Sequence, residues 1–145
     1  MKTDSQQQLA DGAKVLGQLL KPFGFKFHED SHGDDADGAF AKGSFTNGER
    51  VLALCVQSGL GPVTYRIGDA ELSHETFMRF ADHWHHRQYP HAGQTTQESF
   101  VALGQDLARY FGDFVGGDGE LFKTWSREWA ADPKRFHGLA GLGRK

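Results

Sequence analysis

The sequence predicts an α+β fold with an N-terminal helix, a four-stranded antiparallel meander and three C-terminal helices packed on one sheet face. Apolar residues recur with helical spacing at the N-terminus and in the second half, and they alternate with small or polar residues at 23–27 and 63–67. An Asn-Gly pair, which suits a tight hairpin turn, lies between these two alternating segments. Because 145 residues is the size of one domain, we expect a single domain over 1–133 and a flexible, basic, Gly-rich tail over 134–145.

The first helix is expected over residues 4–21, where Asp4 or Ser5 caps the start and Pro22 with Gly24 ends it. Four apolar side chains form its buried stripe: Leu9, Ala13, Leu16 and Leu20.

Four strands follow, and an acidic loop over 29–38 separates the first from the second. The strands are expected at residues 23–27, 39–46, 49–57 and 63–67. Asn47 and Gly48 are predicted to form a type I′ turn, because both residues tolerate positive φ angles. The run 51–56 is apolar on both faces, which predicts that its strand lies at the centre of the sheet.

The second half predicts three helices. The first runs over 73–87 with Ser73 as its cap, and the last runs over about 118–131. Between them, Thr95 and Glu98 have the spacing of a capping box. That middle helix is expected to close at Gly116-Gly117 with a left-handed cap.

Charge and composition narrow the function classes. The net charge is −3, which disfavours nucleic-acid binding because such binding depends on a basic face. No signal peptide and no membrane span is visible in the sequence, so a reducing, bacterial-type cytoplasm is the expected compartment. The single cysteine, Cys55, is interpreted as a buried thiol within an apolar strand.

The acidic stretch is the most distinctive feature of the sequence. It contains no Lys or Arg, and its carboxylates are Glu29, Asp30, Asp34, Asp35 and Asp37. The spacing does not match a calcium-binding loop, because Gly33 and Ser44 occupy positions that require an acidic ligand. It is therefore either a solvated acidic loop or a surface that binds a basic protein partner.

Five histidines fall between positions 74 and 91, and three of them are weak metal candidates: His83, His86 and His91. The spacing of two helical histidines with a glutamate between them is missing, so solvated surface histidines are the favoured interpretation and a metal or pH-sensing role is the alternative. No cofactor is expected.

Catalytic signatures are also missing from the sequence: there is no nucleophile elbow and no phosphate-binding loop. Tyr65, Arg66 and His74 are the ligand candidates. Tyr65 needs a hydroxyl partner if it faces inward, and Arg66 then lies on the outer face of its strand. His74 would be a candidate general base only with a cleft and a carboxylate beside it.

The layout resembles a group of small bacterial α+β proteins of unknown function. The resemblance covers roughly residues 20–115. The segments that carry it are Pro22-Phe23-Gly24-Phe25, residues 38–45, Leu60-Gly61-Pro62-Val63-Thr64-Tyr65, residues 73–79, Tyr89-Pro90, Phe100 with Leu103, and Asp106-Leu107. These segments look structural, and the resemblance implies no catalytic residues.

In size, acidity and lack of catalytic motifs, the chain also resembles immunity proteins of polymorphic toxin systems. The leading hypothesis is a non-enzymatic protein-binding domain that neutralises a basic toxin. The alternative is a small-molecule-binding or metal-binding domain, or an enzyme, that uses Tyr65, His74 and the histidines at 83–91. The protein is expected to be a monomer, or a homodimer that pairs the edge strand near Phe23–Phe27.

Overall fold

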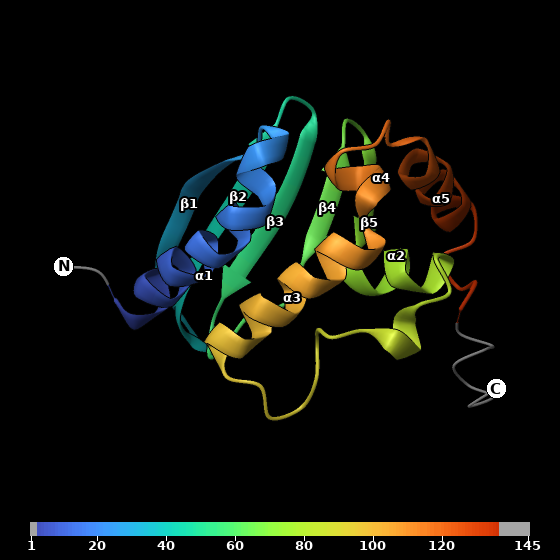
Figure 1. The fold of residues 1–145 in the computed structure, drawn as a ribbon. Helices are drawn as coiled ribbons and strands as arrows, with labels where there is room; N and C mark the ends of the chain where they lie inside the picture. Colours follow the sequence, from blue (N-terminus) through green and yellow to red (C-terminus); the bar gives the residue numbers. More distant parts are fainter. Residues whose placement is uncertain (1–2, 137–145) are drawn as a thin grey trace.

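The computed structural model describes residues 3–136 and has the predicted α+β order of an N-terminal helix, an antiparallel sheet and further helices (Figure 1). The predicted tail at 134–145 therefore lies mostly outside the described residues. The elements are α1 (Asp4–Leu20), β1 (Lys26–Asp35), β2 (Gly38–Asn47), β3 (Arg50–Val56), β4 (Thr64–Ile67), β5 (Ala70–Ser73), α2 (His74–Phe80), α3 (Thr96–Tyr110), α4 (Gly112–Val115) and α5 (Glu120–Ala131).

The sheet is a meander of five strands in the order β1-β2-β3-β4-β5, and each strand runs antiparallel to its neighbour. The prediction of four strands was wrong because β5 is only four residues long. Leu72 is its one buried residue, so the segment carries almost no alternating pattern. The prediction that residues 51–56 form the central strand is confirmed, since β3 has two strands on either side.

The predicted acidic loop is the largest correction. Residues 29–35 belong to β1, which pairs with β2 from Lys26–Thr46 to Asp35–Gly38. Aspartate and glycine are poor strand formers, so local preference favoured a loop. The ladder to β2 overrides that preference and leaves a bulge between Glu29 and Ser31. Phe23, the predicted strand start, instead ends a short 3₁₀ turn.

The hairpin at Asn47-Gly48 is confirmed, but its turn differs from the predicted type. Asn47 pairs with Arg50, so the two loop residues are Gly48 and Glu49. Only Gly48 has a positive φ, at 60°, and this matches a type II′ turn rather than type I′.

Three predictions about helix ends were wrong. Thr3 caps α1 in a capping box with Gln6, so neither Asp4 nor Ser5 is the cap. The helix predicted over 73–87 ends at Phe80, and Asp82 follows in a left-handed conformation with φ of 62°. Gly116 has φ of −129°, so the left-handed cap predicted there does not form. The capping box of Thr95 and Glu98 is confirmed at the start of α3.

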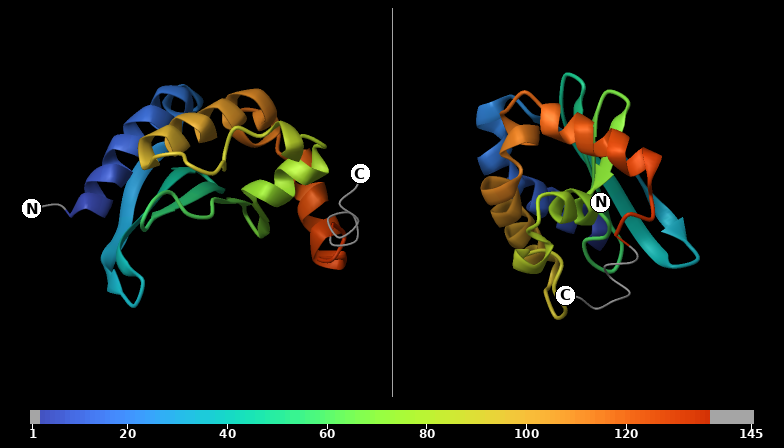
Figure 2. Two further views of the ribbon diagram at one scale, coloured as in Figure 1. Left: turned by 90° about the horizontal axis from the view of Figure 1, so that it is seen from below. Right: turned by 90° about the vertical axis from the view of Figure 1, so that its right-hand side faces the viewer.

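The core lies between the helices and one face of the sheet. Phe45, Leu52, Tyr65 and Leu72 are successive register partners across β2–β5, and all four are buried. Helices α1 and α3 lie side by side in both figures, and α5 runs near β5 (Figures 1 and 2). No helix of the described chain is long and apolar enough to cross a membrane.

Candidate functional site

A cleft of about 380 Å³ opens where the β3–β4 connection meets the start of α2 and the segment between α2 and α3. Its walls are mostly apolar and come from Leu60, Pro62, Val63, Trp84, Tyr89 and Pro90. The polar side chains that line it are Ser73, His74 and Glu75. An apolar cavity with a few polar groups is the usual form of a ligand site, so this cleft is the candidate site.

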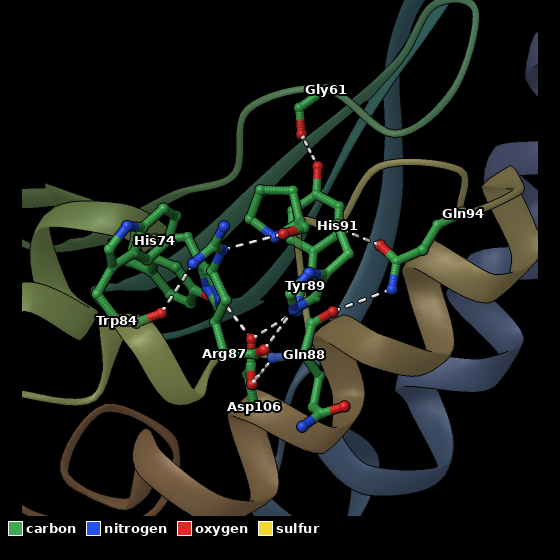
Figure 3. Close-up of polar contacts among 11 residues, drawn as sticks. Gly61, His74, Trp84, Arg87, Gln88, Tyr89, His91, Gln94 and Asp106 are labelled. Carbon is green, nitrogen blue, oxygen red and sulfur yellow. Dashed lines mark hydrogen bonds and ion pairs between the residues drawn. The ribbon is translucent and has the colours of Figure 1, made fainter.

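A buried chain of hydrogen bonds lies behind the cleft. The Tyr65 hydroxyl is 2.8 Å from Nδ1 of His74, and Nε2 of His74 is 2.9 Å from Oδ2 of Asp106. All three residues are buried. The Asp106 carboxylate also accepts the backbone N–H groups of Gln88, at 2.8 Å, and Tyr89, at 3.0 Å (Figure 3).

The network assigns one tautomer to His74. A carboxylate only accepts hydrogen bonds, so Nε2 of His74 must carry the proton that is shared with Asp106. In the neutral ring, Nδ1 then accepts the hydrogen bond from the Tyr65 hydroxyl. Both ring nitrogens are therefore occupied by buried partners, and the imidazole has no free nitrogen to offer a molecule in the cleft.

The two tyrosines of this region stay protonated. Burial raises the pKa of Tyr65 well above its ordinary value, and the negative charge of Asp106 adds to that shift. Burial also raises the pKa of Tyr89 to about 12. Its hydroxyl donates to the carbonyl oxygens of Leu60, at 2.9 Å, and Gly61, at 2.6 Å, and so ties two walls of the cleft together.

The outer wall is held by arginines. Arg87 donates to the carbonyl oxygens of Pro90 and Trp84, and its guanidinium lies 4.1 Å from the centre of the Trp84 ring. Arg79 lies 5.3 Å from the same ring and forms a salt bridge to Glu75. These contacts brace Trp84 and Pro90, two residues of the cleft wall.

The structure brings two predicted ligand residues together and separates the third. Tyr65 and His74 are hydrogen-bonded, whereas Arg66 is exposed and pairs in register with Val51 and Glu71, away from the cleft. Ser73 caps α2 by accepting the Thr76 N–H, as predicted.

Sequence reasoning missed Asp106, Tyr89 and Arg87 as parts of this site. Asp106 did carry a signal, because it lies on the buried stripe of α3 beside Leu103 and Leu107. A carboxylate on an apolar stripe needs buried donors, which predicts a polar partner on a neighbouring element.

The three weak metal candidates do not assemble into a site. Nδ1 of His83 and Nδ1 of His86 are 3.5 Å apart, and the His83 ring stacks on Tyr110. His91 instead donates from Nε2 to the carbonyl oxygen of Arg87. Across residues 3–136, no group of three or more His, Cys, Asp or Glu could hold a metal ion.

The five acidic candidates lie on the β1–β2 hairpin, which we call the acidic hairpin (residues 26–47), and all five are exposed. Glu29 accepts hydrogen bonds from Gln6 and His32. Within the described residues, the carboxylates of Asp30 and Asp34 have no hydrogen-bond or ion-pair partner. The hairpin projects away from the helices (Figure 2).

The tip of the acidic hairpin lies at the same end of the sheet as the cleft. Nε2 of Gln57 donates to Asp35, at 2.8 Å, and to the Gly38 carbonyl oxygen, at 3.0 Å. Gln57 directly follows β3, and Leu60 of the cleft forms a bridge back to Val56. Cys55, predicted to be buried, is only half-buried because its side of β3 carries no described helix.

No family model, no curated protein and no solved structure matches the chain. The resemblance to small bacterial proteins, and to immunity proteins, therefore stays an expectation from the sequence.

Proposed function

We propose that this chain is a non-enzymatic protein-binding domain whose acidic hairpin meets a basic protein partner. The observation that carries the proposal is the exposure of five carboxylates on a hairpin that projects from the body of the domain. A hairpin is a firmer platform for charge than a loop, because the β1–β2 ladder holds the side chains in register.

Electrostatics supports a role in partner capture. Asp30 and Asp34 lack charge partners among the described residues, so their field extends into solvent. Such a field speeds the approach of a basic surface more than it strengthens the final complex. The resemblance to immunity proteins makes a basic toxin the partner class that we propose, and the cytoplasm the compartment.

The chemistry of the cleft agrees with a binding role. A general base needs a nitrogen within reach of the proton it removes. Among the described residues, His74 reaches only the Tyr65 hydroxyl and the Asp106 carboxylate, and both of these partners are fully buried, so the chain of hydrogen bonds serves to fix β4, α2 and α3 relative to one another.

Charge reversal tests the proposal. Asp30 and Asp34 are the best positions, because replacing Asp35 would also break its hydrogen bond to Gln57. The double variant D30K/D34K changes the net charge by four, from −3 to +1. The matched control D69K/D132K makes the same change at two exposed positions outside the acidic hairpin.

The measurement is affinity capture from the source cell with all three proteins, followed by association kinetics with the captured protein over a range of salt concentrations. We expect D30K/D34K to slow association by about tenfold and to flatten its salt dependence, since steering of this kind scales with local charge. D69K/D132K should resemble the wild type. Equal association rates for wild type and D30K/D34K would reject the acidic hairpin as the binding surface.

The cleft favours a second candidate, the binding of a small apolar ligand. Its walls are mostly apolar and are tied together by the hydrogen bonds of Tyr89 and Arg87. Indole is a suitable probe, and NMR is a suitable readout. Amide shifts confined to residues 60–63 and 73–75 would support this candidate, and unchanged spectra at millimolar indole would remove it.

A further inference from the structure

We infer that the partner adds an extended, basic strand to the free edge of β1, so that the five-stranded sheet gains a sixth strand in the complex. The inference rests on the proposed function and names the binding mode. Strand addition is an established way for a sheet edge to bind an extended segment through main-chain hydrogen bonds.

The edge of β1 is open. In the strand order β1-β2-β3-β4-β5, β1 has a neighbour on one side only. Within residues 3–136, the backbone of Ser31–Asp35, the distal half of β1, makes no hydrogen bond to any element other than β2. Nine of its ten residues are exposed, and the remaining one is half-buried. The edge is ten residues long, which is enough for a regular strand pair.

The charge on this edge selects the occupant. A second copy of the chain would pair β1 with β1, and each strand would bring Glu29, Asp30, Asp34 and Asp35 to the ribbon. The four carboxylates of β1 outnumber its one lysine, Lys26, so two copies of this edge carry an excess of like charge that disfavours their pairing. The same charges attract a basic strand, so the acidic edge favours a basic partner over a second copy of this chain.

The register indicates what the added strand should look like. Phe27 pairs with the buried Phe45, so Glu29, two residues later, shares the face that meets the helices. Beyond the bulge, Asp34 pairs with Ala39 and Asp35 with Gly38, so these two carboxylates lie on opposite faces. Basic residues on both faces of the incoming segment would therefore find carboxylates.

The bulge locates the docking segment. Asp30 is the extra residue between Glu29 and Ser31, and a bulge interrupts the spacing of the outer hydrogen-bonding groups. The run from Ser31 to Asp35 is regular in its register with β2. This distal half of β1 is therefore where we expect the added strand to pair.

Synthetic peptides test the binding mode without knowledge of the partner. The probe is a labelled ten-residue peptide that repeats lysine-lysine-threonine-threonine, which places lysines on both faces of a strand. One control has the same sequence and charge with N-methyl groups on alternate amides, which removes the donors along one edge. A second control has glutamate in place of every lysine. Fluorescence anisotropy gives the Kd of each peptide, and amide hydrogen exchange reports on Ser31–Asp35.

The lysine peptide should bind at least about tenfold more tightly than its N-methylated form, because several main-chain hydrogen bonds are lost together. Binding should slow amide exchange in Ser31–Asp35, and D30K/D34K should weaken it while D69K/D132K does not. The glutamate peptide should not bind.

Three outcomes would overturn strand addition. Equal Kd values for the two lysine peptides would mean that charge alone drives binding. No binding of the lysine peptide would also reject it. A dimer with protected β1 amides would assign the edge to a second copy. An acidic hairpin that binds by charge alone survives the first outcome, whereas the proposed function fails only if D30K/D34K leaves partner association unchanged.

Discussion

Replacing Asp106 with asparagine is expected to destabilise the fold strongly. The carboxylate is fully buried and accepts three hydrogen bonds, from Gln88, Tyr89 and His74. Asparagine keeps one acceptor oxygen, so its NH₂ group must face at least one of these donors. A buried donor without an acceptor costs about 1–3 kcal/mol, and the loss of the charge weakens the remaining bonds.

We therefore expect D106N to lower the free energy of unfolding by about 3 kcal/mol, which corresponds to a fall in Tm of roughly 10 °C for a domain of this size. The assay is urea denaturation followed by far-UV circular dichroism. The matched control is D113N, because Asp113 accepts only the Phe122 N–H and is only partly buried.

D113N should cost no more than about 1 kcal/mol, as for a single exposed cap. If D106N and D113N were equally stable, within error, the hydrogen-bond count around Asp106 would not be the source of its stabilising effect. A Y65F/D106N double-mutant cycle then measures whether the effect passes through His74, since both residues contact that ring.

Three other expectations follow from separate features. The pKa of Tyr89 is about 12 in the fold and about 10 in the unfolded chain, so its stabilising effect is complete below pH 10 and is lost as the pH rises to 12. In a pH series of urea denaturation, the wild type should therefore lose about 2–3 kcal/mol more than Y89F over this range, and equal losses would contradict the raised pKa. A side chain on Gly12 of α1 would overlap the ring of Phe100 in α3, so G12A should destabilise by about 1–3 kcal/mol in the same assay, and an unchanged midpoint would mean that α1 and α3 can move apart. T95A removes the cap of α3 and should cost about 1 kcal/mol, while T95S should restore most of it.

The sequence predicted the parts of the fold that depend on local spacing. The apolar stripe of α1, the capping box at Thr95 and the hairpin after Asn47 each involve residues that are close together in the sequence. The central place of β3 followed from its apolar character on both faces. These features need no knowledge of distant contacts.

The elements that the sequence predicted wrongly lack such a local pattern. Residues 29–35 have poor strand preference, and only the ladder to β2 makes them a strand. β5 is too short to show a pattern, and α2 stops at Phe80 through backbone conformation rather than at a proline. Tertiary pairing decides the two strand cases, and no local pattern in the sequence reports it.

The candidate site was predicted only in part. Tyr65 and His74 were both predicted as ligand candidates, and their hydrogen bond joins β4 to the start of α2. Asp106 is 32 residues beyond His74, so its role depends on how α3 crosses the fold. The position of Asp106 on an apolar stripe indicates that it makes a buried polar contact, but it does not identify the partner.

The three-way contact at Asp106 has a consequence for folding. The carboxylate is hydrogen-bonded to His74, 32 residues away, and to Tyr89, 17 residues away. The cleft is therefore complete only when both of these segments have docked on α3. If one of these segments unfolded alone, the buried Asp106 carboxylate would lose a hydrogen-bond donor, so we expect the walls of the cleft to unfold together. A molecule that binds in the cleft should raise the midpoint of global unfolding rather than protect only its own surroundings.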